Sequence, residues 1–170
     1  MENQRDNFIF YDNDVDALNA AGLRILGLLC GGSPAWASVK PRHPNGFYNL
    51  PDAPDGKERW TNYITKMVEH YRGKIDEWEV WNEAWSGYFM DLPKEERGTY
   101  YGELLKLAWA AAKKVNPQAG IVGMVTALEY DQFTEDALKV TGVEFMDYFS
   151  YHDYSGKLYG GDGNRATLQA

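Results

Sequence analysis

Apolar residues recur along the chain at two different spacings, and their order predicts helices followed by strands. From residue 57 to residue 72, apolar side chains return every three or four positions, as on one face of an amphipathic helix. This face consists of Trp60, Tyr63, Ile64, Met67, Val68 and Tyr71. Gly73 ends the pattern, and the β-branched and aromatic residues from Trp78 to Trp81 predict a buried strand that runs through Trp81.

The same helix-then-strand order occurs at other places along the chain. The further pairs are 14–21 with 23–29, 95–115 with 121–125, and 131–140 with 145–151. Strands that alternate with helices pair in parallel, and nearly continuous apolar strands indicate a sheet covered on both faces. A doubly wound sheet and a (β/α)8 barrel both fit this pattern. Because no Gly-x-Gly-x-x-Gly motif follows a strand, a dinucleotide-binding fold has no support. We therefore predict an α/β fold made of the parallel (β/α) units of a TIM barrel.

The length of the chain limits how much of a barrel it can form. Eight β/α units need about 250 residues, whereas this chain has 170 residues. We expect a single domain over residues 1–170 that forms an incomplete, half barrel lacking the first and last strands. Half a barrel leaves strand edges and apolar surfaces uncovered, so self-association or pairing with a complementary barrel fragment is expected. The segments 38–56 and 156–170 are rich in loop-forming residues and are predicted to be loops.

Composition and charge narrow the classes of partner. The net charge of −8 disfavours nucleic acid and anionic membrane surfaces, and no segment approaches the roughly 18 apolar residues of a membrane span. The single cysteine, Cys30, excludes an internal disulfide, and the three histidines show no metal-ligand spacing on a helix. We expect neither a metal nor a cofactor. Residues 1–7 contain no signal peptide, which leaves cytoplasmic and secreted locations both open.

The sharpest candidate for chemistry is the pair Asn82-Glu83, which follows the apolar strand that ends at Trp81. Hydrolysis of a glycosidic bond needs a carboxylic acid that protonates the leaving oxygen and a second carboxylate opposite it. Aromatic walls such as Trp81 and Trp85 would favour the protonated acid by excluding water. The amide of Asn82 could bind a sugar hydroxyl. The alternative is that Glu83 is a solvated residue at the start of a loop.

Other residues follow strands or share a strand with Glu83. His152 and Tyr154 stand two apart after the last predicted strand, so they share one side and could bind substrate or orient a carboxylate. Their alternative role is as hydrogen-bonded members of the barrel rim. Trp36 is expected either to stack on a sugar or to cover the end of the barrel. Glu79, in the same strand as Glu83, points inward or is a buried salt-bridge partner.

Taken in order, these segments resemble the central part of a clan A glycoside hydrolase, a retaining enzyme with a TIM-barrel fold. Residues 33–37, Ser-Pro-Ala-Trp-Ala, resemble the Pro-x-Trp-Ala segment after barrel strand three. Residues 79–83, Glu-Val-Trp-Asn-Glu, resemble the fourth strand, and residues 147–154 resemble the sixth strand with its His-x-Tyr signature. The resemblance is closest to the xylosidase/iduronidase-like and cellulase-like families, and it covers barrel strands three to six.

The resemblance implies hydrolysis of O-glycosidic bonds with retention, through a double displacement by two carboxylates. Glu83 would be the general acid/base. The substrate-binding residues would be Asn82, His152, Tyr154, Trp36 and Trp85. The substrate would be an oligosaccharide or another glycoside.

The chain departs from the pattern of these families in two ways. Asn82-Glu83-Ala84 stands where many members have Asn-Glu-Pro. The families place the nucleophile at the end of the seventh strand, and no glutamate follows Glu144 in this chain. We therefore expect the nucleophile to be missing and the chain alone to show little or no turnover. Two other classes remain: a non-catalytic carbohydrate-binding or scaffold protein derived from the same barrel, and an unrelated α/β domain.

Overall fold

The computed structural model describes residues 2–29, 33–39, 49–127 and 132–152. Its elements are β1 (Glu2–Gln4), β2 (Asn7–Phe8), α1 (Asp12–Ala20), β3 (Leu26–Leu29), the 3₁₀ helix η1 (Ala35–Ala37), α2 (Gly56–His70), β4 (Glu77–Val80), α3 (Lys94–Val115), β5 (Gly120–Ala127), α4 (Gln132–Thr141) and β6 (Tyr148–His152). Strands β3, β4, β5 and β6 form one sheet in this order, and each neighbouring pair is parallel. The predicted α/β fold of parallel (β/α) units is confirmed.

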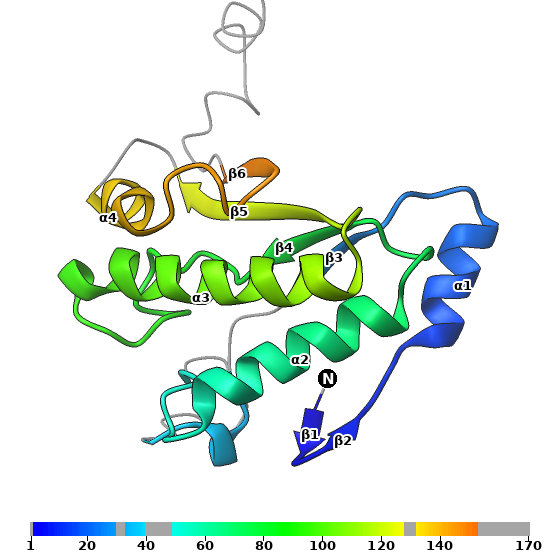
Figure 1. Ribbon diagram of the computed structural model, residues 1–170, viewed down its shortest axis with the longest axis horizontal. Coiled ribbons are helices and arrows are strands. Elements are labelled where there is room, and N and C mark those ends of the chain that lie inside the picture. The colour runs from blue at the N-terminus through cyan, green and yellow to red at the C-terminus, as the bar shows by residue number, and fades with distance from the viewer. Residues whose placement is uncertain (1, 30–32, 40–48, 128–131, 153–170) are drawn as a thin grey trace, which may run out of the picture.

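Helices α2, α3 and α4 lie between successive strands in the chain and pack together beside the sheet (Figure 1). Their apolar sides meet the strand side chains that point toward them, and together these residues form the core. Fully buried members include Ile64 and Val68 of α2, Leu104 and Leu105 of α3, Ala137 of α4, Val80 of β4 and Ile121 of β5. A parallel sheet with helices on its outer side is the wall of a TIM barrel.

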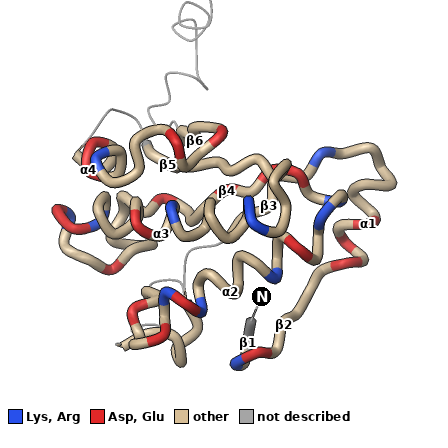
Figure 2. Tube along the Cα trace, in the orientation of Figure 1, with Lys and Arg blue, Asp and Glu red and all other residues tan. Residues whose placement is uncertain are grey.

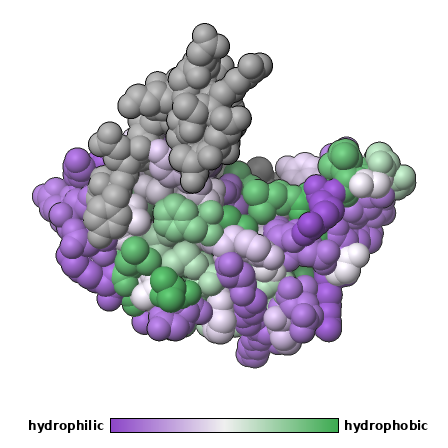
Figure 3. Space-filling model, turned by 90° about the horizontal axis from the view of Figure 1, so that it is seen from above, coloured by the Kyte–Doolittle hydropathy of each residue, from purple (hydrophilic) through white to green (hydrophobic). Residues whose placement is uncertain are grey.

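The opposite face of the sheet, which we name the barrel face, carries Leu26 and Leu28 of β3 and Glu77 and Glu79 of β4. The register places Leu26 beside Glu77 and Leu28 beside Glu79. Leu26 and Leu28 are 53% and 43% exposed, and apolar surface is visible among polar residues on the side of the molecule shown in Figure 3. The sequence predicts strands covered on both faces, and this prediction is wrong for β3 and for β6, where Tyr148, Phe149 and Tyr151 are exposed. Four strands are too few to close a barrel around their inner side chains.

The predicted bounds agree closely for the helices and less closely for two strands. The sequence predicts strands from residues 23 and 145, whereas β3 begins at Leu26 and β6 at Tyr148. Before β6, the Asp147 carboxylate accepts a hydrogen bond from the backbone N–H of Ile121 at 2.8 Å. The Asp147 N–H donates to the carbonyl of Ile121 at 2.7 Å, so Asp147 itself caps the start of the β5–β6 pairing, which begins with Tyr148 opposite Val122.

Some predicted segments fall outside the part of the chain that the structure describes. They are the loop 156–170 and the middle of the loop 38–56, residues 40–48. Among the described helices, none combines the length and apolar character needed to cross a membrane. Charged residues of both signs are distributed over the helices and loops (Figure 2).

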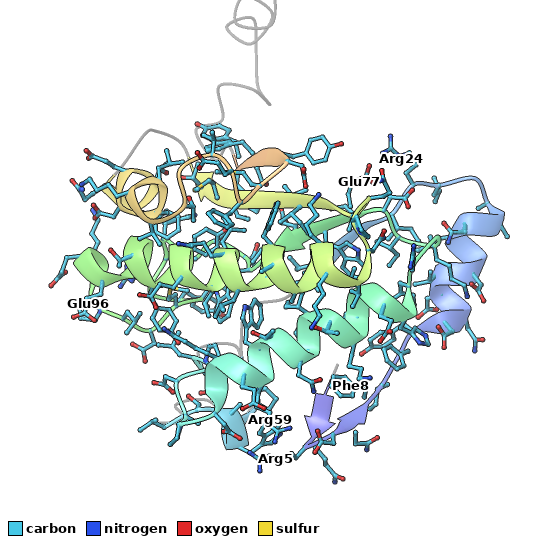
Figure 4. All side chains as sticks on the ribbon, viewed as in Figure 1. Arg5, Phe8, Arg24, Arg59, Glu77 and Glu96 are labelled. Carbon is cyan, nitrogen blue, oxygen red and sulfur yellow. The ribbon has the colours of Figure 1, made fainter. Side chains whose placement is uncertain are left out.

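Strands β1 and β2 form a separate antiparallel hairpin that the sequence does not predict. Arg5, in the turn of this hairpin, pairs with Asp55 at the start of α2. Arg59 of α2 pairs with Asp6 of the hairpin at 2.9 Å and with Asp55 at 3.2 Å. Figure 4 shows Arg5 and Arg59 side by side at this junction. The hairpin is therefore held against the start of α2 by a network of charges.

Strand β5 contains a bulge close to its carboxyl end. Met124 and Val125 have φ angles of 74° and 41°, and the register with β6 shifts between Gly123 and Thr126. The Tyr101 hydroxyl accepts a hydrogen bond from the N–H of Met124 at 2.8 Å and donates one to the carbonyl of Val80 at 3.1 Å. Burial raises the pKa of Tyr101, so its hydroxyl keeps the proton that it donates. Tyr101 thus links the bulge to the end of β4.

Candidate active site

Glu83 lies just beyond the carboxyl end of β4, where the chain leaves the sheet in an unusual backbone conformation. Trp81 has a φ of 68°, and its N–H donates to the carbonyl of Leu29 at 2.9 Å, which continues the pairing with β3. Its ring packs edge-on against Trp60 in the core, and its indole N–H donates to the carbonyl of Phe89 at 3.1 Å. The left-handed turn at Trp81 ends the strand, and Glu83 follows with a φ of 44°.

The structure brings Glu83 together with His152, the last residue of β6. Oε1 of Glu83 is 2.9 Å from Nδ1 of His152. Glu83 is buried, with 8% of its surface exposed, whereas His152 is half-buried. Because β5 lies between β4 and β6, this contact spans the neighbouring strand. Nδ1–H can donate to a carboxylate, and unprotonated Nδ1 can accept from a carboxylic acid, so the pair accommodates Glu83 in both protonation states.

Trp85 stands in the loop that follows Glu83. Its indole N–H is buried and has no hydrogen-bond partner among the described residues, an arrangement that is costly unless another group, a ligand or water completes it. The carbonyl of Trp85 accepts a hydrogen bond from Nη1 of Arg97 at 3.0 Å, and Nε of Arg97 donates to the carbonyl of Leu92 at 2.8 Å. Arg97 on α3 therefore holds the loop that carries Trp85, a role that the sequence alone does not indicate.

Trp36, the other expected stacking residue, belongs to η1. It is half-buried, and its indole N–H is also buried, with no hydrogen-bond partner in the part of the chain that the structure describes. The Arg5 guanidinium lies 5.7 Å from the centre of its ring, so one face of the ring is in a cation–π contact with the hairpin. A sugar that stacks on Trp36 would have to use the opposite face or displace Arg5.

For the remaining predicted site residues, Asn82 and Tyr154, the structure gives little detail. Asn82 is half-buried directly before Glu83. Tyr154 lies outside the described residues. In the described part of the chain, no group of three or more His, Cys, Asp or Glu residues is arranged to hold a metal ion.

The sequence does not predict the contact between Glu79 and Ser150, which lies beside the site. Glu79 is buried, and its Oε1 accepts a hydrogen bond of 2.6 Å from Oγ of Ser150 on β6. The sequence suggests that Glu79 points inward or forms a salt bridge. The structure shows the first arrangement, with a serine in place of a cation. The signal in the sequence was a glutamate between two large apolar residues, Trp78 and Val80, but no local pattern could name Ser150 as its partner.

Comparison with known proteins identifies the family of this chain. The sequence profile of glycosyl hydrolase family 10 matches residues 1–137. The chain belongs to glycosyl hydrolase family 10. The match includes β3, β4 and β5 together with Glu83, and it ends before β6 and His152. A comparison with curated proteins gives no match.

Several solved structures with a similar fold are glycoside hydrolases. A family 39 glycoside hydrolase from Bacteroides cellulosilyticus WH2 matches 89% of this chain with a TM-score of 0.66 and 24% identity. A family 10 structure from Paenibacillus barcinonensis matches 99% with a TM-score of 0.62 and 19% identity. A monomeric β-xylosidase from Caulobacter crescentus CB15 matches 83% with a TM-score of 0.61 and 22% identity.

The matched regions are parts of longer chains. The alignment covers 30% of the Bacteroides protein, 29% of the Caulobacter protein and 54% of the Paenibacillus protein. The resemblance to clan A glycoside hydrolases is confirmed by the family profile and by these structures. The described strands are consecutive units of the barrel that these proteins share.

Proposed function

We propose that this chain carries the acid/base part of the active site of a retaining O-glycoside hydrolase, with Glu83 as the general acid/base. The observation that supports this most is the contact between Glu83 and His152 at the carboxyl end of the sheet. A buried carboxyl group with an imidazole beside it, at this end of a barrel wall, suits a group that must release and regain a proton.

In the first step of this mechanism, Glu83 gives its proton to the glycosidic oxygen while a nucleophilic carboxylate attacks the anomeric carbon. Glu83 is then a carboxylate, and His152 can stabilise it by donating a hydrogen bond from Nδ1. In the second step, Glu83 takes a proton from water as the water attacks the glycosyl-enzyme intermediate, which releases the sugar and restores the acid.

The substrate would be held by groups around Glu83. We propose that Asn82 binds a hydroxyl of the sugar and that the buried indole N–H of Trp85 donates a hydrogen bond to another. Trp36 and Tyr154 would line neighbouring parts of the site. Among the structures similar to this chain are proteins described as a β-xylosidase and an endo-β-1,4-xylanase, so xylosides are the first substrates to test.

The nucleophile is proposed to lie on a later barrel strand, as the resemblance implies. The 170 residues alone are therefore expected to give little or no turnover, because no covalent intermediate would form. Activity should be measured on the full-length gene product that contains these residues.

The experiment compares Glu83→Gln with the wild-type protein on xylo-oligosaccharides and on an aryl xyloside with a good leaving group. The substitution should lower kcat/KM on the oligosaccharides by about 10²- to 10⁴-fold. Azide should restore part of the activity on the aryl xyloside, because it replaces the water that needs a general base. Glu77→Gln, the same change at the amino end of β4, where Glu77 pairs with Arg24, is the matched control (Figure 4).

Two results would contradict the proposal. Unchanged hydrolysis by Glu83→Gln would remove Glu83 from the mechanism. A wild-type protein that binds xylo-oligosaccharides and hydrolyses none of the glycosides tested would instead support the non-catalytic carbohydrate-binding alternative.

A further inference from the structure

Glu79 is a carboxylate in a place that ordinarily selects an apolar residue. It stands inside β4 between Trp78 and Val80, both members of the core, and only 9% of its surface is exposed. Burial of a charged group is costly unless the group is hydrogen-bonded or paired. Within the described residues, Glu79 forms no ion pair with Lys or Arg, and its hydrogen-bond donor is the hydroxyl of Ser150. Departures from local rules of this kind concentrate at functional sites.

The Glu79 contact runs parallel to the Glu83 contact. Ser150 donates to Glu79 at 2.6 Å, and His152 lies 2.9 Å from Glu83. Ser150 and His152 are two residues apart on β6, so their side chains leave the same face of the strand, about 7 Å apart. Each contact therefore connects β6 with β4 or the segment that follows it, across β5.

The backbone explains why β6 needs such a connection. β6 is an edge strand of the described sheet, and β5 is its only strand neighbour there. The register with β5 pairs Gly123 with Phe149 and then Thr126 with Tyr151, so Ser150 falls opposite the bulge and has no Cα partner. The hydrogen bond from Ser150 to Glu79 thus acts at the point where the backbone pairing of β6 is interrupted, just before the pairing resumes at Tyr151 and His152.

We propose that Glu79 and Ser150 form a positioning pair that holds the end of β6 so that His152 reaches Glu83. This inference rests on the proposed role of Glu83. Neither Glu79 nor Ser150 has to touch the substrate. Their hydrogen bond fixes β6 relative to β4, and His152 takes its place from that constraint.

The primary test follows the imidazole nitrogens of His152 by ¹⁵N NMR in the 170-residue chain, which needs no activity. The His152 signals are assigned with His152→Gln, and Glu83→Gln shows how they respond when the contact partner changes. Ser150→Ala should shift them in the same direction as Glu83→Gln, and Ser150→Thr, which keeps the hydroxyl, should restore most of the wild-type values. Ser38→Ala, which removes another serine-to-carboxylate hydrogen bond, to Asp52 at 3.2 Å, should leave them unchanged.

Glu79→Gln provides a second variant in case Ser150→Ala does not fold. The amide keeps an oxygen that can accept the serine hydrogen bond, but the bond loses its charge, so an intermediate shift of the His152 signals is expected. In the full-length gene product, Ser150→Ala should lower kcat by about 10- to 100-fold with KM within about twofold of the wild-type value.

Unchanged His152 signals in folded Ser150→Ala and Glu79→Gln proteins would overturn the proposal. So would an equal loss of kcat in Ser150→Ala and Ser150→Thr, because the hydroxyl would then not matter. Failure of the proposed function is recognised separately, by unchanged hydrolysis in Glu83→Gln, and it does not depend on the His152 signals.

Discussion

Nδ1 of His152 lies 2.9 Å from Oε1 of Glu83, although the two residues are 69 positions apart and stand at the ends of strands that are not neighbours. Each residue is recognisable in the sequence as a polar group after an apolar strand. The structure shows that their side chains are in contact. The proposed acid/base role of Glu83 therefore depends on where β6 holds His152.

His152→Ala should lower kcat/KM of the full-length gene product by about 10- to 100-fold on xylo-oligosaccharides, because Glu83 loses the donor that stabilises its carboxylate form. Substrates with good leaving groups should lose less, because they depend less on proton transfer from Glu83. The measurement is kcat/KM over a series of aryl xylosides. His70→Ala is the control, since His70 contacts Asp12 at 2.6 Å at the end of α2. An equal loss in both variants would contradict the role of His152.

Tyr101→Phe should lower the free energy of unfolding by about 1–3 kcal/mol, since the carbonyl of Val80 and the N–H of Met124 would both lose a buried partner. Urea unfolding monitored by circular dichroism measures this change. Tyr100→Phe is a matched control at the adjacent position, because the Tyr100 hydroxyl is buried with no partner among residues 2–29, 33–39, 49–127 and 132–152, so its removal should be neutral or stabilising. A similar loss in both variants would show that the bulge does not depend on Tyr101.

Gly98→Ala should destabilise the protein although alanine is the better helix former. A Cβ at this position would lie 2.5 Å from the carbonyl oxygen of Phe133 and 2.9 Å from Cβ of Asp136, so α3 and α4 would have to separate. Overpacking of this kind costs about 1–3 kcal/mol, against about 1 kcal/mol gained from helix propensity. Thermal unfolding tests the prediction. Ala110→Gly, exposed on the same helix, measures the propensity term alone.

Asp147 should contribute stability that disappears in acid. Burial favours its neutral form, but hydrogen bonds from Lys113 and from the N–H of Ile121, each at 2.8 Å, outweigh burial and hold the pKa of Asp147 below its ordinary value. The folded state therefore binds this proton less readily than the unfolded state does. The contribution is complete above the ordinary pKa of about 4 and is lost as the pH falls through the lower folded pKa.

Asp147→Asn should consequently make stability less dependent on pH below about pH 4. Urea unfolding at a series of pH values between about 2.5 and 6 gives the comparison. Identical slopes for the variant and the wild-type protein would show that Asp147 titrates alike in both states.

The order of helices and strands could be predicted because apolar spacing and helix-ending glycines act over a few residues. The β1–β2 hairpin could not, since its place depends on ion pairs between Arg5, Asp6 and the start of α2. The place of the Trp81 side chain could not be predicted either. The sequence suggests that Trp81 forms an aromatic wall beside Glu83, whereas in the structure Trp81 has a φ of 68° and its ring packs in the core against Trp60.

By itself, the sequence determined that parallel β/α units form the fold and that Glu83 and His152 lie at the carboxyl ends of two of the strands. Both conclusions follow from local periodicity and from the rule that parallel strands share a carboxyl edge. Only the tertiary structure decided which side chains meet. The contacts of Glu83 with His152 and of Glu79 with Ser150 depend on strand register and on a bulge in β5, and these arise from packing between residues far apart in the chain.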